Sequence, residues 1–184
     1  MTASTTAVER VRAAYRDFAG NGAGGAPDWL KGLREAGIAA LGSLGFPSSS
    51  DEAWRLTSVA PLLESEFGLP AAGTAVTVGA PPATGRVRLV FVNGRFDVGS
   101  SSLRELPDGV TVTDLATALG RHPDLVRASL GASGAHRGNA FAALNTAFVS
   151  DGLLVHVADG VELAEPVEAL FLSSLTRLPT EKES

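Results

Sequence analysis

The fold is decided by the stretch Val87-Arg-Leu-Val-Phe-Val-Asn-Gly-Arg-Phe-Asp-Val98. Asn93-Gly94 in its middle is the typical sequence of a two-residue type I′ turn, because both central positions of that turn need a positive φ angle. The flanking residues are β-branched, aliphatic and aromatic, as strands prefer. The stretch therefore predicts a β-hairpin with strands over 87–92 and 95–98.

The register of this hairpin follows from the length of its turn. A two-residue turn places Phe91 opposite Phe96 and Leu89 opposite Val98. One face of the hairpin is then apolar, and the other face carries Arg88.

N-terminal to the hairpin, the spacing of apolar residues predicts helices. Val8, Val11, Tyr15 and Phe18 recur at intervals of three, four and three residues, which indicates an amphipathic helix. A Gly-rich link over 20–25 ends it.

A second helix is expected to begin at Asp28, which can cap it, and to end at Gly45 and Pro47. Its predicted apolar stripe consists of Leu30, Leu33, Gly37, Leu41 and Leu44.

A short third helix carrying Trp54 is predicted from Ser49 and Glu52, which have the spacing of a capping box. The neighbouring carboxylates of Asp51 and Glu52 point in different directions on a helix, so an acid–base pair is not expected. A capping role is the favoured interpretation for Glu52.

Short elements fill the middle of the chain. Strands are predicted over 75–78 and 110–112, and helices over 114–120 and 123–130. Gly131 is expected just past the end of the second of these helices.

Asn139 is expected to cap a further helix, whose apolar face is Phe141, Leu144 and Phe148. Asn145 on the same helix could instead pin the junction to the following strand, or satisfy backbone groups nearby.

From Asp151 onward, brief strands are predicted over 153–157, 161–163 and 167–172. Short strands with tight turns are typical of a sandwich, a barrel or a β-helix. About thirty residues of this kind cannot bury their own apolar face, because a solenoid needs roughly three stacked repeats. The segment therefore has the pattern of a β-domain cut off near its beginning.

Composition excludes several function classes. The chain has 184 residues, no cysteine and a net charge of −5 spread without long runs, so neither a nucleic-acid surface nor all-cysteine cluster ligation is expected. No apolar run approaches the length of a membrane span, and the first residues lack the pattern of a secretion signal. A cytoplasmic protein is the expectation.

The sequence predicts no catalytic, cofactor-binding or metal-binding residues. The three histidines, His122, His136 and His156, have spacings that match no metal site. His122 is expected to cap a helix, His136 to be solvated in a Gly-rich loop, and His156 to face opposite to its neighbours in a strand. No nucleophile elbow or phosphate-binding loop is present, and an enzyme is not expected.

Three ordered blocks resemble the N-terminal portion of SufD, in the SufB/SufD family of iron–sulfur cluster assembly scaffolds. The first is a Pro…Asp-Glu-x-Trp-Arg/Lys-Tyr-Thr motif, in which Leu56 replaces the usual Tyr. The second is the Val-Asn-Gly hairpin followed by the stretch 106–110. The third joins the stretch 139–148 to Asp151-Gly152. The matching residues of the first block are Pro47, Asp51, Glu52, Trp54, Arg55 and Thr57.

The resemblance covers about residues 45–172 and implies a fold. It implies an α+β chain with a mainly helical N-terminal domain over 1–148 that contains the hairpin. The first strands of a truncated right-handed parallel β-helix would follow over 149–184. SufB is a paralogue, but the Trp motif is more typical of SufD.

The resemblance also implies a function, which is that of a non-catalytic scaffold fragment of the SUF complex. SufB and the SufC ATPase are the partners implied for the full-length protein, through segments beyond Ser184. An uncovered edge would permit self-association through the C-terminal strands. The alternative is a protein with a short β-solenoid that binds a small ligand or handles sugar or acyl groups.

Overall fold

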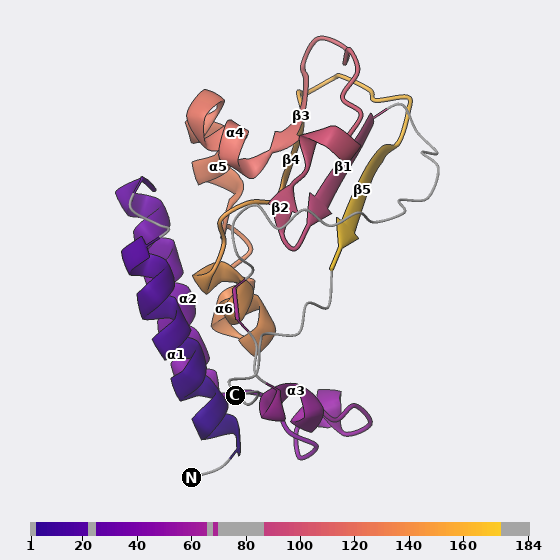
Figure 1. Cartoon of the computed structure of the whole chain (residues 1–184). Coiled ribbons are helices and arrows are strands. Elements are labelled where there is room, and N and C mark those ends of the chain that lie inside the picture. Colours follow the sequence, from indigo (N-terminus) through magenta and orange to yellow (C-terminus); the bar gives the residue numbers. More distant parts are fainter. Residues whose placement is uncertain (1–2, 22–24, 66–67, 70–86, 174–184) are drawn as a thin grey trace, which may run out of the picture. The chain divides into compact units, whose positions relative to one another are not determined.

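A computed structural model describes residues 3–21, 25–65, 68–69 and 87–173. The chain divides into two compact units, one formed by residues 1–69 and 127–149, the other by residues 70–126 and 150–184. Each unit is therefore discontinuous in sequence. The described residues confirm a mixed α+β chain with six α-helices and small sheets (Figure 1).

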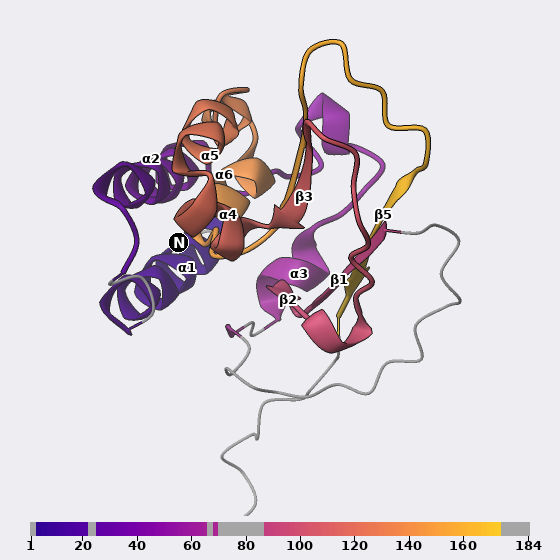
Figure 2. The ribbon, with the colours of Figure 1, turned by 90° about the horizontal axis from the view of Figure 1, so that it is seen from above.

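The first unit is helical. Helix α1 (Ala3–Asn21) lies beside α2 (Asp28–Leu44), and α6 (Ala140–Ala147) packs closely on α2 (Figure 2). The short helix α3 (Ala60–Glu64) contacts α1. The main apolar core lies among these elements and consists of Ala7, Val8, Leu41, Phe46, Val59, Leu63, Ala140 and Ala143.

The contact of α2 with α6 depends on small residues. A Cβ at Gly37 would lie 2.7 Å from the backbone N of Ala147 and 2.9 Å from the carbonyl O of Ala143. Both alanines are fully buried. The two helix backbones therefore approach at a distance that only glycine permits.

The second unit contains the predicted hairpin. Strands β1 (Val87–Val92) and β2 (Arg95–Phe96) pair antiparallel with Phe91 opposite Phe96, and the two turn residues have φ angles of 50° and 77°. The type I′ turn is confirmed, and so is the Phe91 register. Val98 instead begins a 3₁₀ turn (Val98–Ser100) and is 75% exposed, so the predicted Leu89–Val98 pair is wrong.

The late strands complete two separate sheets. β4 (Leu153–Val157) pairs antiparallel with β3 (Val110–Asp114), and β5 (Val167–Leu172) pairs parallel with β1. The three-stranded sheet therefore has the order β2-β1-β5, with β1 in the centre (Figure 1). Within the described residues these strands form no closed solenoid. The division at residue 148 into two domains stays a prediction.

Two helices link β3 to the first unit. They are α4 (Leu115–Arg121) and α5 (Pro123–Ser129), which confirm the two helices predicted there. The Asp114 carboxylate caps α4 by accepting from the backbone N–H of Thr117 at 2.8 Å. Gly131 has a φ of 79° just past the end of α5, as predicted.

Several predicted details of α2 are wrong. Its N-cap is Pro27, and Asp28 is the first helical residue, forming an ion pair with Lys31 at 3.0 Å. Leu44 is 44% exposed and lies outside the buried stripe. Gly45 does end the helix, with a φ of 66°.

The predicted capping box is also wrong. The third helix is a 3₁₀ turn (Glu52–Trp54) that carries Trp54, and no side chain caps it. The Asp51 carboxylate instead accepts from the backbone N–H of Ser48 at 2.7 Å, one residue earlier than the box requires. Glu52 forms an ion pair with Arg55 at 2.9 Å.

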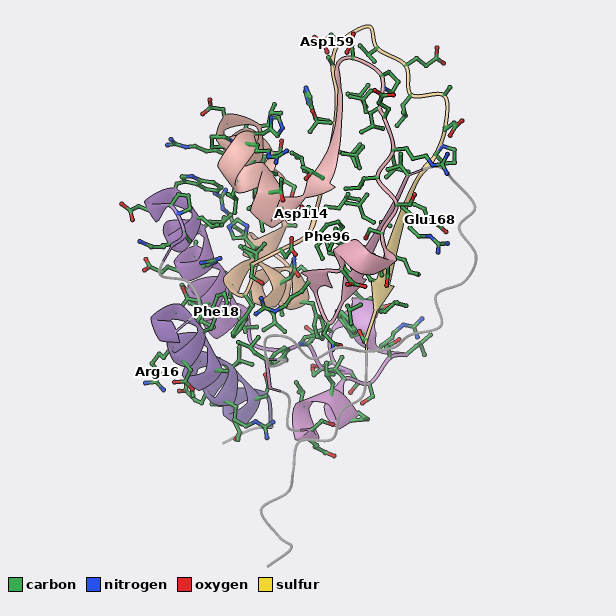
Figure 3. All side chains as sticks on the ribbon, turned by 45° about the horizontal axis from the view of Figure 1, so that its top comes forward. Arg16, Phe18, Phe96, Asp114, Asp159 and Glu168 are labelled. Atoms are coloured by element: carbon green, nitrogen blue, oxygen red, sulfur yellow. The ribbon has the colours of Figure 1, made fainter. Side chains whose placement is uncertain are left out.

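Two predicted strands have other outcomes. Residues 161–163 form no strand, because a turn at Asp159-Gly160 ends the β3–β4 ladder and the chain must then cross to β1. The strand predicted over 75–78 lies outside the described residues. Arg88, expected on the polar face of the hairpin, is only 5% exposed and forms an ion pair with Glu168 of β5. Figure 3 labels Glu168 on this strand.

Candidate interaction groove

Two segments that are far apart in sequence line one groove in the helical unit. The groove has a volume of about 200 Å³ and is lined by residues of 44–54 and of 138–141. It contains Pro47, Asp51 and Trp54 from the first motif block, and Asn139 and Phe141 from the third. The fold therefore brings together residues that the sequence presents almost ninety positions apart.

Local structure fixes the first wall of the groove. The backbone N–H of Phe46 donates to Ser4 Oγ of α1 at 3.0 Å, which holds the chain where α2 ends. The turn from Ser48 to Asp51 then directs the chain into the 3₁₀ turn, where the Trp54 N–H donates to the Asp51 carbonyl at 2.8 Å. Trp54 is partly exposed on this turn.

The second wall is the capped start of α6. The side-chain Oδ1 of Asn139 accepts from the backbone N–H groups of Phe141 and Ala142 at 2.9 and 3.0 Å, which confirms its predicted role. Phe141 then lies between two rings, with centroids 5.7 Å from Phe46 and 5.3 Å from Trp54. Such tilted aromatic contacts stabilise the packing of α6 against the 3₁₀ turn.

The apolar face predicted for α6 is corrected by this arrangement. The buried residues of the helix are Ala140, Ala143 and Ala147, whereas Phe141, Leu144 and Phe148 are only partly buried. Small residues face α2 and allow the two backbones to approach closely, whereas the large residues lie outside this contact. Asn145, which the sequence left open between two roles, is exposed.

In the second unit, the Asp151-Gly152 block ties elements together. The Asp151 carboxylate accepts from the backbone N–H of Phe96 at 2.7 Å, and the Gly152 carbonyl accepts from the N–H of Leu115 at 2.7 Å. The hairpin and the start of α4 are therefore both held by the chain that enters β4. This part of the motif has a structural role.

The histidines lie in three different places. His122 ends α4, and its carbonyl accepts from Val126 N–H of α5, so the predicted capping position is confirmed. His136 is only 5% exposed, so its predicted solvation is wrong; it lies on a 3₁₀ turn (Ala135–Arg137) packed against α2 and α6. His156 is partly exposed on β4, between the exposed Val155 and Val157.

No metal-binding group is found among the residues that the structure describes, where no three His, Cys, Asp or Glu side chains gather in a suitable way. Within the same residues, no helix is both long and apolar enough to cross a membrane.

Arg34 is the functional candidate that the sequence analysis missed. It is 5% exposed on α2, and its Nε donates to the Val149 carbonyl at 2.9 Å. Burial lowers the pKa of the guanidinium, and the neighbouring Tyr15 partly offsets that effect. Arg34 lies four residues after Leu30 and seven residues before Leu41, which places it on the buried face of the helix. This spacing is the sequence signal that could have identified Arg34.

Comparison with known proteins gives a family. Residues 11–169 match the family described as the SufBD protein N-terminal region. An iron–sulfur cluster assembly SufBD family protein of Synechocystis sp., slr0076, is 30% identical over 155 residues, which are 82% of this chain and 34% of that protein. The chain belongs to the SufBD family.

A second SufBD family protein of Synechocystis sp., slr0074, is 37% identical over 90 residues, 47% of this chain and 19% of the relative. The chain therefore spans about a third or less of the length of these two relatives. SufBD membership confirms the resemblance found in the ordered blocks, at the level of the family. These matches do not distinguish SufB from SufD.

Proposed function

We propose that the protein acts as a non-catalytic scaffold component of SUF iron–sulfur cluster assembly, on the SufD side of the family. The observation that carries the proposal is the match of residues 11–169 to the N-terminal region of SufBD proteins. The groove supports it, because its lining of aromatic rings, a helix cap and one carboxylate suits contact with a partner rather than chemistry. The Trp54 motif favours SufD over SufB.

Three finer statements belong to the proposal. The chain is a fragment of a longer scaffold in which a right-handed parallel β-helix continues from residue 149 onward. SufB and SufC are the partners of the full-length protein, and the complex is cytoplasmic. The parallel pairing of β5 with β1 is consistent with a β-helix, whose strands also pair in parallel.

Co-expression tests the partners. The natural gene product that contains residues 1–184, carrying a tag, should retain SufB and SufC through affinity and size-exclusion chromatography. Residues 1–184 alone should retain neither, since the binding segments of the family lie beyond Ser184. If the natural gene product retains neither partner while a known SufD retains both, the proposal is wrong.

Cluster binding gives a second test of the scaffold role. The chain has no cysteine, so residues 1–184 alone cannot supply the thiolates that hold most iron–sulfur clusters. Anaerobic reconstitution with iron and sulfide should leave a colourless protein after desalting. A stoichiometric coloured species that survives chromatography would contradict this part of the proposal.

A further inference from the structure

Arg34 is a buried cation whose hydrogen bonding is incomplete. Its Nε donates to the Val149 carbonyl, and the guanidinium carbon lies 5.1 Å from the centre of the Phe18 ring. Its Nη1 is buried and has no hydrogen-bond partner among the described residues. The ion pairs of the described chain also leave Arg34 out.

This arrangement costs stability. A buried donor without an acceptor loses its hydration and gains nothing in return. Burial lowers the pKa of Arg34, which means that the charged form is less stable in the folded protein than in the unfolded chain. The cost is present at every pH below the lowered pKa. A role limited to holding Val149 would need only one donor.

The Phe18 ring that contacts this cation belongs to a cluster of half-buried aromatic rings. Tyr15 and Phe18 of α1 lie 5.8 and 5.4 Å from Phe148 at the end of α6, measured between ring centroids. Figure 3 labels Phe18 and shows Arg16 of the same helix pointing outward. Aromatic residues and arginine are enriched in the energetic centres of protein interfaces.

We propose that Arg34, with Tyr15, Phe18 and Phe148, forms a docking site for a protein partner that inserts an Asp or Glu side chain. The carboxylate supplies the acceptor that Nη1 lacks, and the rings contact the apolar part of the inserted segment. Because Arg34 is only 5% exposed, the side chains that cover Nη1 must move before a carboxylate can reach it.

The chemistry favours a carboxylate on a polypeptide over a free anion. A carboxylate carries one negative charge, which matches the single charge of Arg34, whereas a phosphate carries more than one near neutral pH and would bring an unbalanced charge into an apolar site. A free carboxylate would gain nothing from the three rings. This inference does not depend on the role in cluster assembly.

The test uses NMR on the whole chain, following the Nε–Hε signal of Arg34 and the amides of Phe18 and Phe148. The probes are acetyl-Gly-Phe-Glu-Gly-amide and the same peptide with Gln in place of Glu. The Glu peptide should shift all three sets of signals and should bind about tenfold more tightly than the Gln peptide. Free acetate should cause no saturable shift at the same concentrations.

Variants separate docking from a structural role. Arg34→Met should abolish the difference between the two peptides while its melting midpoint stays equal or rises, because an unpaired buried charge is removed. Arg16→Met, which removes the same charge from an exposed position of α1, should leave the difference intact. Arg34→Lys keeps the charge and should retain part of the preference for the Glu peptide. This variant replaces Arg34→Met in the test if Arg34→Met does not fold.

Two results would overturn the proposal. One is that neither peptide binds, or that both bind equally. The other is that Arg34→Met lowers the melting midpoint sharply without any effect on peptide preference, which would leave Arg34 as an anchor for the chain after α6.

Discussion

The helical pair α2–α6 packs through small residues, whereas the sheet β2-β1-β5 packs through large ones. The helices are joined by Gly37, Ala143 and Ala147, and their backbones nearly touch. The sheet is centred on β1, where Leu89, Val90 and Phe91 are fully buried. Small residues thus form the closest helix contact, and large residues form the centre of the sheet.

The comparison teaches where a substitution acts. At the helix pair a single added methyl group meets backbone atoms, which cannot rotate away. At the hairpin, Gly94 has open space around it. Replacing it therefore lowers stability only because its positive φ angle is unfavourable for other residues. Replacing a glycine therefore tests side-chain packing at the helix pair and backbone conformation at the hairpin.

The largest effect is expected for Gly37→Ala. The new Cβ would meet the Ala147 N and the Ala143 O at less than 3.0 Å, and we expect a loss of about 2–3 kcal/mol in the free energy of unfolding. Gly32→Ala on the same helix is the control, because its Cβ meets nothing within 4 Å and should stabilise by about 0.5–1 kcal/mol. Urea unfolding of both variants measures this, and equal effects would contradict the close helix contact.

Gly94→Val should have the next largest effect. The residue has a φ of 77°, and a β-branched side chain there should cost about 1–3 kcal/mol although nothing lies in its way. Gly94→Asn should keep most of the stability, since asparagine tolerates this conformation. Thermal melts of the three proteins decide the matter; an unchanged midpoint for the Val variant would remove the type I′ turn as a stabilising feature.

Asn139→Ala should cost about 1 kcal/mol, because it removes the side-chain acceptor that caps α6. Asn145→Ala, at an exposed position of the same helix, should change stability by less than about 0.5 kcal/mol. Chemical denaturation gives both values. Asn139→Ala should also alter Trp54 fluorescence, because the position of Phe141 next to Trp54 depends on the cap. If Asn139→Ala lost no more stability than Asn145→Ala, the capping role would be wrong.

The sequence predicted best what a few adjacent residues decide. The Asn93-Gly94 turn and the Asn139 cap are local codes, and the structure confirms both. The parallel pairing of β5 with β1 joins residues 87–92 to 167–172, and no local pattern encodes such a distant partner.

The helix contact was predicted only in part, for a different reason. The stripe predicted for α2 correctly included Leu30, Gly37 and Leu41. The preference for large apolar residues also selected Leu44, Leu144 and Phe148, whereas α6 contributes alanines to the closest contact. Arg34 was missed because a charged residue is ordinarily assigned to the exposed face. The groove could not be predicted, since its two walls meet only through the packing of α6 on α2.

The smallest effect on stability, with a larger one on association, is expected for Phe171→Lys. Phe171 is 63% exposed on β5, where it stacks on Phe91 at 4.9 Å, and no described strand pairs with the outer edge of β5. An exposed apolar edge strand recruits further strands, and lysine is the side chain that most effectively prevents this. If the predicted self-association through the C-terminal strands occurs, Phe171→Lys should shift the protein toward monomer in light scattering across a concentration series. Val98→Lys is the matched control, because Val98 is 75% exposed but lies outside the sheets. A parent chain that is monomeric at all concentrations, or equal changes in both variants, would show that the edge of β5 does not mediate association.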